Sequence, residues 1–456
     1  MKKKQLRWTL WTIASPFILF IILCILIYLP PIQNFLVDKA AVYASEATGM
    51  NISVGRISLS FPLNLVVTDV DAASPHKDTL LSVRRLQVNV QLLPLLKKQV
   101  EVDGISLQGA TVNSNDLIHG MKLNGTLGEL FISSHGVALD PETAIVNKVL
   151  LKDTDLSLCL NDTAAADTAA SDTTYWKIIL QDIDLQNVSF ALDMPLDSLS
   201  LAASLDNAIL RDGLIDLHKS AYSLQTFRIK NGRVRYDSGR PSATASADSL
   251  SAGLDPSHIA LTDIGVKLDS LYYEGRNMKA VISQFVLKER SGVEIVSTEG
   301  RLVSNDKVLR VPSLKLETRD SYLELNAAMD WDALDFKKEG LVSARLMADI
   351  GKPDVVRFMG SMDEKFIRKY PSEPLRIRTG IDGDLNKLKL TTLTAELPGA
   401  LELFAKGELT SLTDSLLRGG DITLQAETKD LKFISTLAEG IEIPYGTRLE
   451  GKFTMA

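Results

Sequence analysis

The sequence predicts a mainly β protein: an N-terminal transmembrane helix, then an antiparallel β-sheet of repeated units with a few short helices. Three observations carry this prediction. One uncharged segment is long enough to cross a bilayer, apolar and polar residues alternate from residue 51 onward, and helical periodicity is scarce elsewhere. With 456 residues, the chain can also bury a sizeable core.

The predicted membrane span covers residues 10–29, which carry no formal charge. At about 1.5 Å rise per residue, this helix crosses a hydrocarbon core of roughly 30 Å. Basic residues at positions 2, 3, 4 and 7 precede it, so the positive-inside rule predicts a cytoplasmic stub at residues 1–9. The alternative is a cleaved signal peptide, whose apolar region is usually shorter, about 7–15 residues.

Residues 30–49 are predicted to form a short amphipathic helix after the span. Pro30 and Pro31 end the transmembrane helix, and Gly49 is suited to a C-terminal cap. This helix either lies on the outer leaflet of the membrane or caps the first strands.

Two β-rich regions, 50–160 and 175–350, follow. Their period-two alternation is typical of half-buried strands, and Gly, Asp and Asn are interpreted as turns between short strands. Thr318–Ser321 is predicted to be a hairpin turn. A sheet with one apolar face must cover it with a second sheet, with helices or with lipid, and this chain supplies few helices. The candidate residues for a lipid groove are Leu86, Val88, Val90, Leu314, Leu316, Leu323 and Leu325. In the alternative, closed sandwich domains, the same residues are ordinary core.

Residues 161–174 form a polar, low-complexity stretch that is predicted to be a disordered loop. It contains Asp-Thr-Ala and Asp-Thr-Thr triplets, which resemble the O-glycosylation sequon of Bacteroidetes. The candidate acceptors are Thr163, Thr168 and Thr173. The alternative is a linker that is merely rich in Asp, Thr and Ala.

The last region, 351–456, is predicted to repeat a helix-plus-strand unit. Helical stretches at 353–370 and 431–438 are each followed by a proline turn and a strand. The second copy stops at the end of the sequence. We expect either a chain truncated at its C-terminus or a strand edge that a partner completes.

The sequence contains no recognisable catalytic motif. Its five histidines are scattered, and no HExxH, GxSxG or CxxC motif occurs, so we expect neither an enzyme nor a metal site or cofactor. The net charge of −7 without a basic stripe disfavours nucleic acid as a partner. Cys24 and Cys159 are too few for a disulfide framework.

Three stretches together resemble the AsmA-like family, and within it the N-terminal part of a TamB-type protein. They are the charged start with its single span and following helix, residues 83–112, and the repeated Asp/Gly/Leu strand pattern near the end. The resemblance implies an anchor in the inner membrane of a diderm bacterium and a periplasmic body whose elongated, twisted sheet curls into a groove.

The function implied by this resemblance is a bridge that conducts phospholipids toward the outer membrane. The resemblance also implies a role in outer-membrane protein assembly with a barrel partner, whose docking domain is not visible in this sequence. The alternative function is therefore an assembly factor that binds clients through its sheet edges. An anchored periplasmic hydrolase is disfavoured by the missing catalytic motifs.

Overall fold

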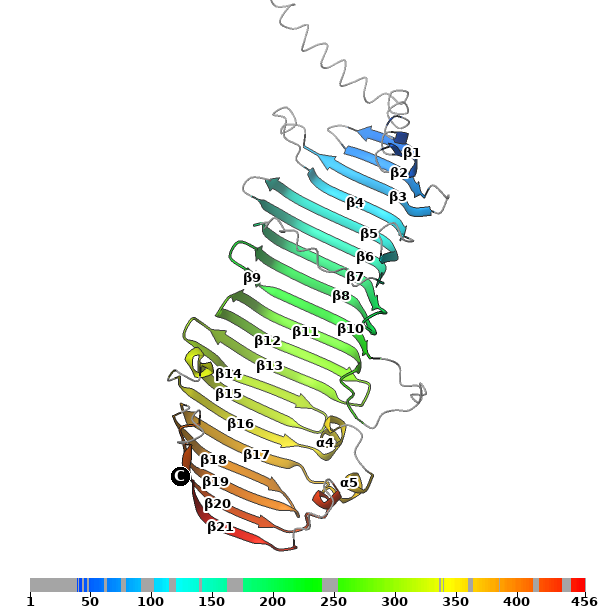
Figure 1. Ribbon diagram of the computed structural model, residues 1–456. Coiled ribbons are helices and arrows are strands. Elements are labelled where there is room, and N and C mark those ends of the chain that lie inside the picture. The colour runs from blue at the N-terminus through cyan, green and yellow to red at the C-terminus, as the bar shows by residue number, and fades with distance from the viewer. Residues whose placement is uncertain are drawn as a thin grey trace, which may run out of the picture. The chain divides into compact units, whose positions relative to one another are not determined.

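A computed structural model describes residues 39, 41–42, 45–46, 49–60, 64–74, 79–91, 102–114, 120–138, 142–161, 175–239, 253–335, 338, 340–359, 364–384, 386–412, 418–436 and 444–455. Most of them lie in strands, which confirms the mainly β class (Figure 1). The strands belong to one antiparallel sheet of 21 strands, not to two sheets packed face to face.

The predicted span at residues 10–29 lies outside the described residues. Among the described residues, no helix is both long and apolar enough to cross a membrane. Part of the predicted helix that follows is present, because residues 39, 41–42 and 45–46 are helical. Gly49 has a φ of 68°, and its N–H donates to the Ser45 carbonyl at 2.9 Å. The predicted glycine cap is therefore confirmed.

The chain divides into two compact units, and the first contains residues 1–173 and 178–196. Consecutive strands from β1 to β6 pair in antiparallel register. Asn187 on β7 donates from Nδ2 to Asp153 Oδ1 on β6 at 2.9 Å. The strands are β1 (Asn51–Ser60), β2 (Asn64–Ala73), β3 (Thr79–Val90), β4 (Val102–Asn113), β5 (Met121–Ala138), β6 (Thr143–Leu160) and β7 (Lys177–Met194).

The second unit contains residues 174–177 and 197–456. Strand β8 pairs with β9 and β10, both of these pair with β11, and each later strand pairs with the next. The strands are β8 (Leu199–Asp216), β9 (Ala221–Leu224), β10 (Thr226–Ser238), β11 (His258–Glu274), β12 (Asn277–Glu289), β13 (Glu294–Ser304), β14 (Val308–Thr318), β15 (Tyr322–Asp330), β16 (Val342–Ile350), β17 (Leu375–Gly383), β18 (Lys387–Leu397), β19 (Leu401–Thr410), β20 (Gly419–Thr428) and β21 (Arg448–Met455). The hairpin turn predicted at Thr318–Ser321 is confirmed by the bounds of β14 and β15.

The interpretation of Gly, Asp and Asn as turns between short strands is wrong at several positions. Strands β5 to β8 are each 18 residues long. Asp153 and Asn187 lie inside strands with φ of 49° and 52°. Short polar side chains tolerate this left-handed conformation, so the strand continues instead of turning. The β5–β6 register is the same on both sides of Asp153. A Cβ on Gly128 would lie 2.8 Å from the Cβ of Asp153, so this close approach requires glycine.

The helical segments also differ from the prediction. The stretch 353–370 contains two helices, α4 (Lys352–Phe358) and α5 (Glu364–Lys369), instead of one. The second predicted helix is replaced by a 3-10 turn, η2 (Ile434–Thr436). A second 3-10 turn, η1 (Trp331–Leu334), was not predicted. In the first predicted copy the two helices are followed by β17, and in the second the 3-10 turn is followed by β21.

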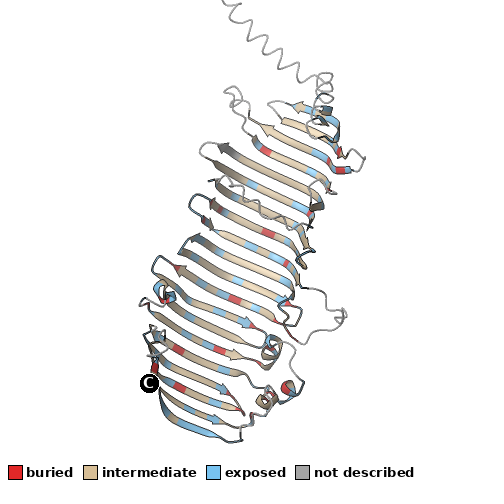
Figure 2. Ribbon diagram, viewed as in Figure 1, coloured by how far each residue is buried: buried red, intermediate tan, exposed pale blue. Residues whose placement is uncertain are grey.

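Buried side chains are few, because the sheet carries no second layer of described residues. Figure 2 shows them scattered along the strands. Among the described residues, one buried hydrophobic cluster forms where α5 and the segment around η2 pack over the β18–β19 hairpin. Its aromatic rings lie 5.2 to 5.9 Å apart. The cluster consists of Phe366, Tyr370, Leu397, Ala400, Leu431 and Phe433.

Candidate functional site: an apolar sheet face

The strand register determines which side chains share a face of the sheet, because directly opposed residues in antiparallel strands project to the same side. In the first unit, two neighbouring rows of opposed residues cross β1 to β6, and every member of both is aliphatic. The first row is Ile57, Val67, Leu86, Leu107, Leu130 and Leu151; the second is Leu59, Leu65, Val88, Ile105, Ile132 and Val149.

The opposite face of the same unit is mostly polar. One row on it contains no hydrophobic residue: Arg56, Thr68, Arg85, Gln108, Glu129 and Lys152. The row between the two aliphatic ones is mixed and consists of Ser58, Val66, Gln87, Ser106, Phe131 and Leu150. The first unit therefore has one aliphatic face and one face on which polar side chains predominate.

The second unit has the same two-sided character over a longer series. One row crosses from β8 to β21 and is interrupted by a single polar residue, Thr379. Its members are Leu210, Phe227, Leu268, Ile282, Gly300, Leu314, Leu325, Leu346, Thr379, Leu393, Ala405, Leu424 and Gly451. Glycine at two positions leaves the row without a side chain but adds no polar group.

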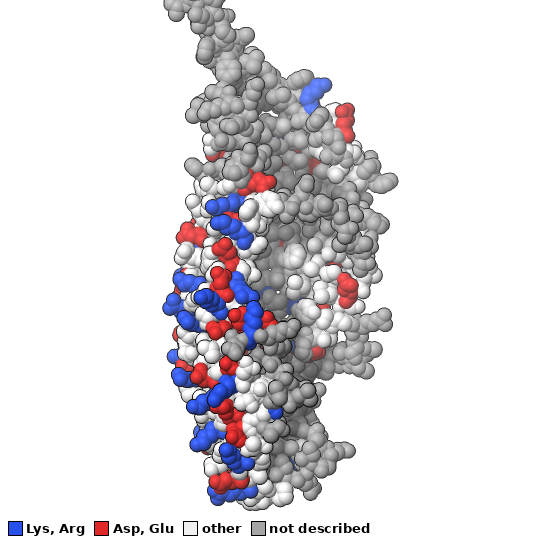
Figure 3. All heavy atoms as spheres, turned by 60° about the vertical axis from the view of Figure 1, so that its left-hand side comes forward, with Lys and Arg blue, Asp and Glu red and all other residues white. Residues whose placement is uncertain are grey.

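Charged residues gather on the other face of this unit. Glu299, Lys315 and Glu324 are opposed across β13 to β15. Ion pairs such as Arg376–Glu396 at 3.5 Å and Lys429–Glu402 at 3.0 Å balance the charge there. Figure 3 shows Lys and Arg intermixed with Asp and Glu along one side of the molecule. Such a face is stable in water and needs no cover.

The seven groove candidates all fall on the apolar faces. Leu86, Val88 and Val90 alternate on β3 of the first unit. In the second unit Leu314 opposes Leu325, and Leu316 opposes Leu323. None of the seven is buried and none is fully exposed. A closed core would bury them, so these side chains keep part of their surface open.

Sequence reasoning missed most members of the rows. Leu107, Leu130, Leu346 and Leu393 belong to the apolar faces as fully as the predicted residues do. Leu107 and Leu393 alternate with polar neighbours, which was the available signal. Leu130 and Leu346 are followed directly by Phe131 and Met347, so alternation does not assign their face.

Titratable side chains form no catalytic arrangement in the parts of the chain that the structure describes. No group of three or more His, Cys, Asp or Glu there could hold a metal ion. The clearest pair is His258 Nδ1 with Asp255 Oδ2 at 2.9 Å, and this hydrogen bond lowers the pKa of Asp255. Thr163, Thr168 and Thr173 lie outside the described residues. Their modification remains a prediction, which the intact mass of the native protein tests.

No family model and no curated protein sequence matches this chain. The resemblance to the AsmA-like family therefore rests on the sequence stretches alone.

Proposed function

We propose that this protein is a membrane-anchored bridge whose apolar sheet face holds the acyl chains of phospholipids. The observation that supports it is the row of opposed, largely apolar residues that continues from strand to strand in each unit and is mostly partly exposed. Water contact makes such a surface unfavourable, and each methylene of a covering acyl chain contributes about 0.8 kcal/mol. The rows contain no charged side chain that would select one position along them, as expected for a path.

The cellular setting of the proposal comes from the sequence. The segment 10–29 anchors the chain in an inner membrane with its N-terminus in the cytoplasm and its body in the periplasm. Transfer would run toward an outer membrane, with phospholipids as cargo. A barrel protein of the outer membrane is a further proposed partner.

The test is native mass spectrometry of the full chain extracted in mild detergent. We expect copurifying phospholipid with the native chain and a marked loss of it in Leu325→Asp and Val88→Asp. The matched controls are Asn326→Asp and Gln87→Asp, which place the same new charge on the polar face of the same strands. Circular dichroism of each variant checks that the sheet is intact. Folded apolar-face variants that keep all their lipid would contradict the proposal.

The alternative function, binding of unfolded outer-membrane protein clients by strand addition, is favoured by one observation. Among the described strands, β21 pairs only with β20. Its Leu449 and Phe453 are exposed. An unpaired edge can accept a further strand. Crosslinkers placed along β21 decide between the two functions, since they capture either polypeptide or lipid.

A further inference from the structure

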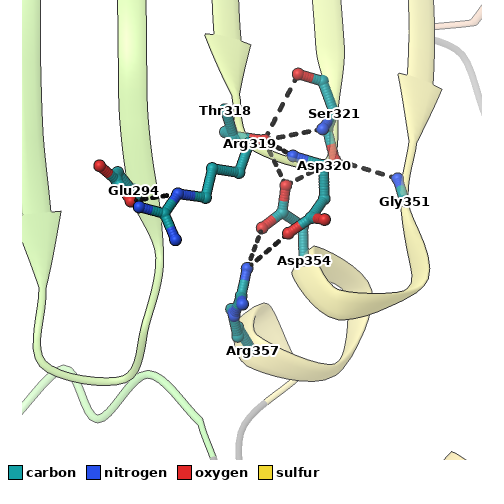
Figure 4. A network of polar contacts seen from close by, with 8 residues as sticks. All are labelled: Glu294, Thr318, Arg319, Asp320, Ser321, Gly351, Asp354 and Arg357. Atoms are coloured by element: carbon teal, nitrogen blue, oxygen red, sulfur yellow. Dashed lines mark hydrogen bonds and ion pairs between the residues drawn. The ribbon is translucent and has the colours of Figure 1, made fainter.

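The two ends of the strands in the second unit are built differently. One end, here called the helix rim, carries α4, α5 and η2. The buried hydrophobic cluster covers the apolar face there, and Leu397 is only 4% exposed. Figure 4 shows α4 fastened to the hairpin turn after β14: Asp354 accepts hydrogen bonds from Thr318 and Ser321, and Arg357 pairs with Asp320 at 2.8 Å. A lipid on the apolar face meets packed protein at this rim.

The opposite end, here called the turn rim, has no buried hydrophobic cluster among the described residues. It carries three hairpin turns, Leu217–Ser220, Gly275–Arg276 and Asn305–Lys307, and the 3-10 turn η1. Tyr222 and Tyr273, beside the first two turns, are opposed across β9 and β11 with ring centroids 6.1 Å apart, and each is 41% exposed. Tyr222 also opposes Ile215, and Tyr273 opposes Met278. The tyrosine pair therefore lies at the margin of the apolar face.

Three cations lie in the same turns: Lys219, Arg276 and Lys307. Arg276 holds the turns together, because Nη1 donates to the Asp306 carbonyl at 3.5 Å and the guanidinium lies 5.6 Å from the Trp331 ring. Within the described residues none of the three cations forms an ion pair. These three turns contain one carboxylate, Asp306, which accepts a hydrogen bond from Asn277 at 3.4 Å. The carboxylates nearby have partners of their own: Glu274 accepts a hydrogen bond from Tyr272, and Asp332 and Asp335 at η1 pair with Lys338.

We propose that the turn rim is where phosphate-bearing lipid headgroups leave the sheet. This inference rests on the proposed function and adds an orientation to it: acyl chains on the apolar face point toward the helix rim. Tyrosine rings favour the boundary between acyl chains and headgroups, since one end is apolar and the other polar. Lys219, Arg276 and Lys307 then lie where they attract the lipid phosphate.

The experiment uses the full chain in detergent and two photoreactive phosphatidylethanolamines. One carries its diazirine on the headgroup and the other at the end of an acyl chain. Labelled peptides are identified by mass spectrometry. We expect the headgroup probe to label the turns at 217–220, 275–276 and 305–307, and the acyl probe to label β14 and β15.

Charge removal at the turn rim sharpens the test. Each lost cation weakens the attraction to an anionic lipid group by about fivefold. In the triple variant Lys219→Gln, Arg276→Gln, Lys307→Gln, headgroup labelling should therefore fall by at least about fivefold. Acyl labelling should persist. The matched control Lys365→Gln, Lys369→Gln, Lys432→Gln removes three charges at the helix rim and should change neither signal.

Three results would overturn the inference. The first is headgroup labelling at the helix rim or equally at both rims. The second is complete competition by excess inorganic phosphate, which would assign the turn rim to free phosphate. The third is an absence of labelling by both probes, which overturns the proposed function as well. In the first two results the acyl probe still labels the apolar face, so the two failures are distinguishable.

Discussion

At the scale of single residues, the structure depends on polar side chains whose hydrogen bonds are satisfied inside the fold. Asp354 is 1% exposed, yet it accepts hydrogen bonds from Ser321 Oγ at 2.6 Å, from the Thr318 hydroxyl and from Arg357 Nη1 at 3.1 Å. Ser321 Oγ in turn accepts from the Gly351 N–H at 3.0 Å. Burying a carboxylate is tolerable only with such partners.

Asp354→Ala should therefore destabilise the helix rim strongly. It leaves two hydroxyls without their acceptor and removes one carboxylate from Arg357, for a cost of about 3 kcal/mol. The measurement is amide hydrogen exchange at Ser321 and Gly351, with chemical unfolding of the whole chain beside it. Asp332→Ala is the control, because that side chain is 55% exposed and pairs only with Lys338 on the surface. Equal protection of these amides from exchange in both variants would argue against a stabilising role of the hydrogen bonds around Asp354.

Tyr370 makes the same rim sensitive to alkaline pH. Its ring packs in the buried cluster, and burial raises the pKa of its hydroxyl above the ordinary 10.0. The folded state thus favours the neutral phenol. This contribution to stability is complete below pH 10 and is lost as pH rises through the higher folded-state pKa.

The expected result is a smaller loss of stability above pH 10 in Tyr370→Phe than in the native chain. The comparison is made by unfolding both proteins in denaturant at a series of alkaline pH values. Tyr273→Phe, which changes an exposed tyrosine, is the control and should follow the native chain. If the free energy of unfolding of the native chain and of Tyr370→Phe fell in parallel with pH, Tyr370 would not be the source of the alkaline sensitivity.

At the scale of elements, β5 to β8 extend over 18 residues each, although some of their residues have a positive φ. Asp153 takes the left-handed conformation, accepts a hydrogen bond from Asn187 and approaches Gly128 closely. The β5–β6 register is the same on both sides of this site. The strand pair therefore continues through Asp153 because glycine opposite it leaves room for the close approach.

Gly128→Val should disrupt the β5–β6 pair. A Cβ there would lie 3.0 Å from the carbonyl oxygens of Lys152 and Asp153, so the backbone would have to shift. We expect a loss of about 1–3 kcal/mol on unfolding, which is typical of overpacking. Gly451→Val serves as the control, since the nearest atom to a Cβ at that position is 3.6 Å away. Similar unfolding midpoints for the two variants would show that the close approach at Gly128 tolerates a side chain.

At the scale of the whole molecule, most of the sheet has no protein layer over its apolar face in the residues that the structure describes. Stability comes instead from strand pairing and from the one hydrophobic cluster at the helix rim. An uncovered aliphatic face is a cost in water. That cost falls when lipid covers the face, so lipid depletion should lower the stability of the isolated protein.

The anchor is the other prediction at this scale. Deleting residues 1–29 should release the protein from the membrane fraction while the sheet stays folded, because the described strands begin at Asn51. Fractionation of cell membranes measures the release, and circular dichroism checks the sheet. Replacing residues 10–29 with another apolar span of equal length is the control and should restore membrane association.

Much of the fold could be predicted from local patterns. Alternation in segments such as Leu86–Val90 indicates a strand and shows which of its residues share a face, because the pleat of a strand is a local property. The cap at Gly49 and the turn after Thr318 were likewise predicted correctly, since the conformation of each depends on a few neighbouring residues.

The candidate site could be predicted only in part. The predicted Leu314, Leu316, Leu323 and Leu325 do share one face, but their alignment with residues such as Leu346 and Leu393 depends on register between strands. Register follows from long-range pairing and from bulges. The difference between the turn rim and the helix rim had no sequence signal, because Tyr222 and Tyr273 are far apart in the chain.

Local residue patterns were therefore enough to predict strands with one apolar side and one polar side. They also predict a membrane anchor and contain no catalytic motif. The alignment of apolar residues from successive strands into rows, the partial exposure of most of these residues and the packed cluster at the helix rim became visible in the three-dimensional fold. The physical reason is that alternation arises from geometry within a strand, whereas exposure depends on what the whole chain places over it.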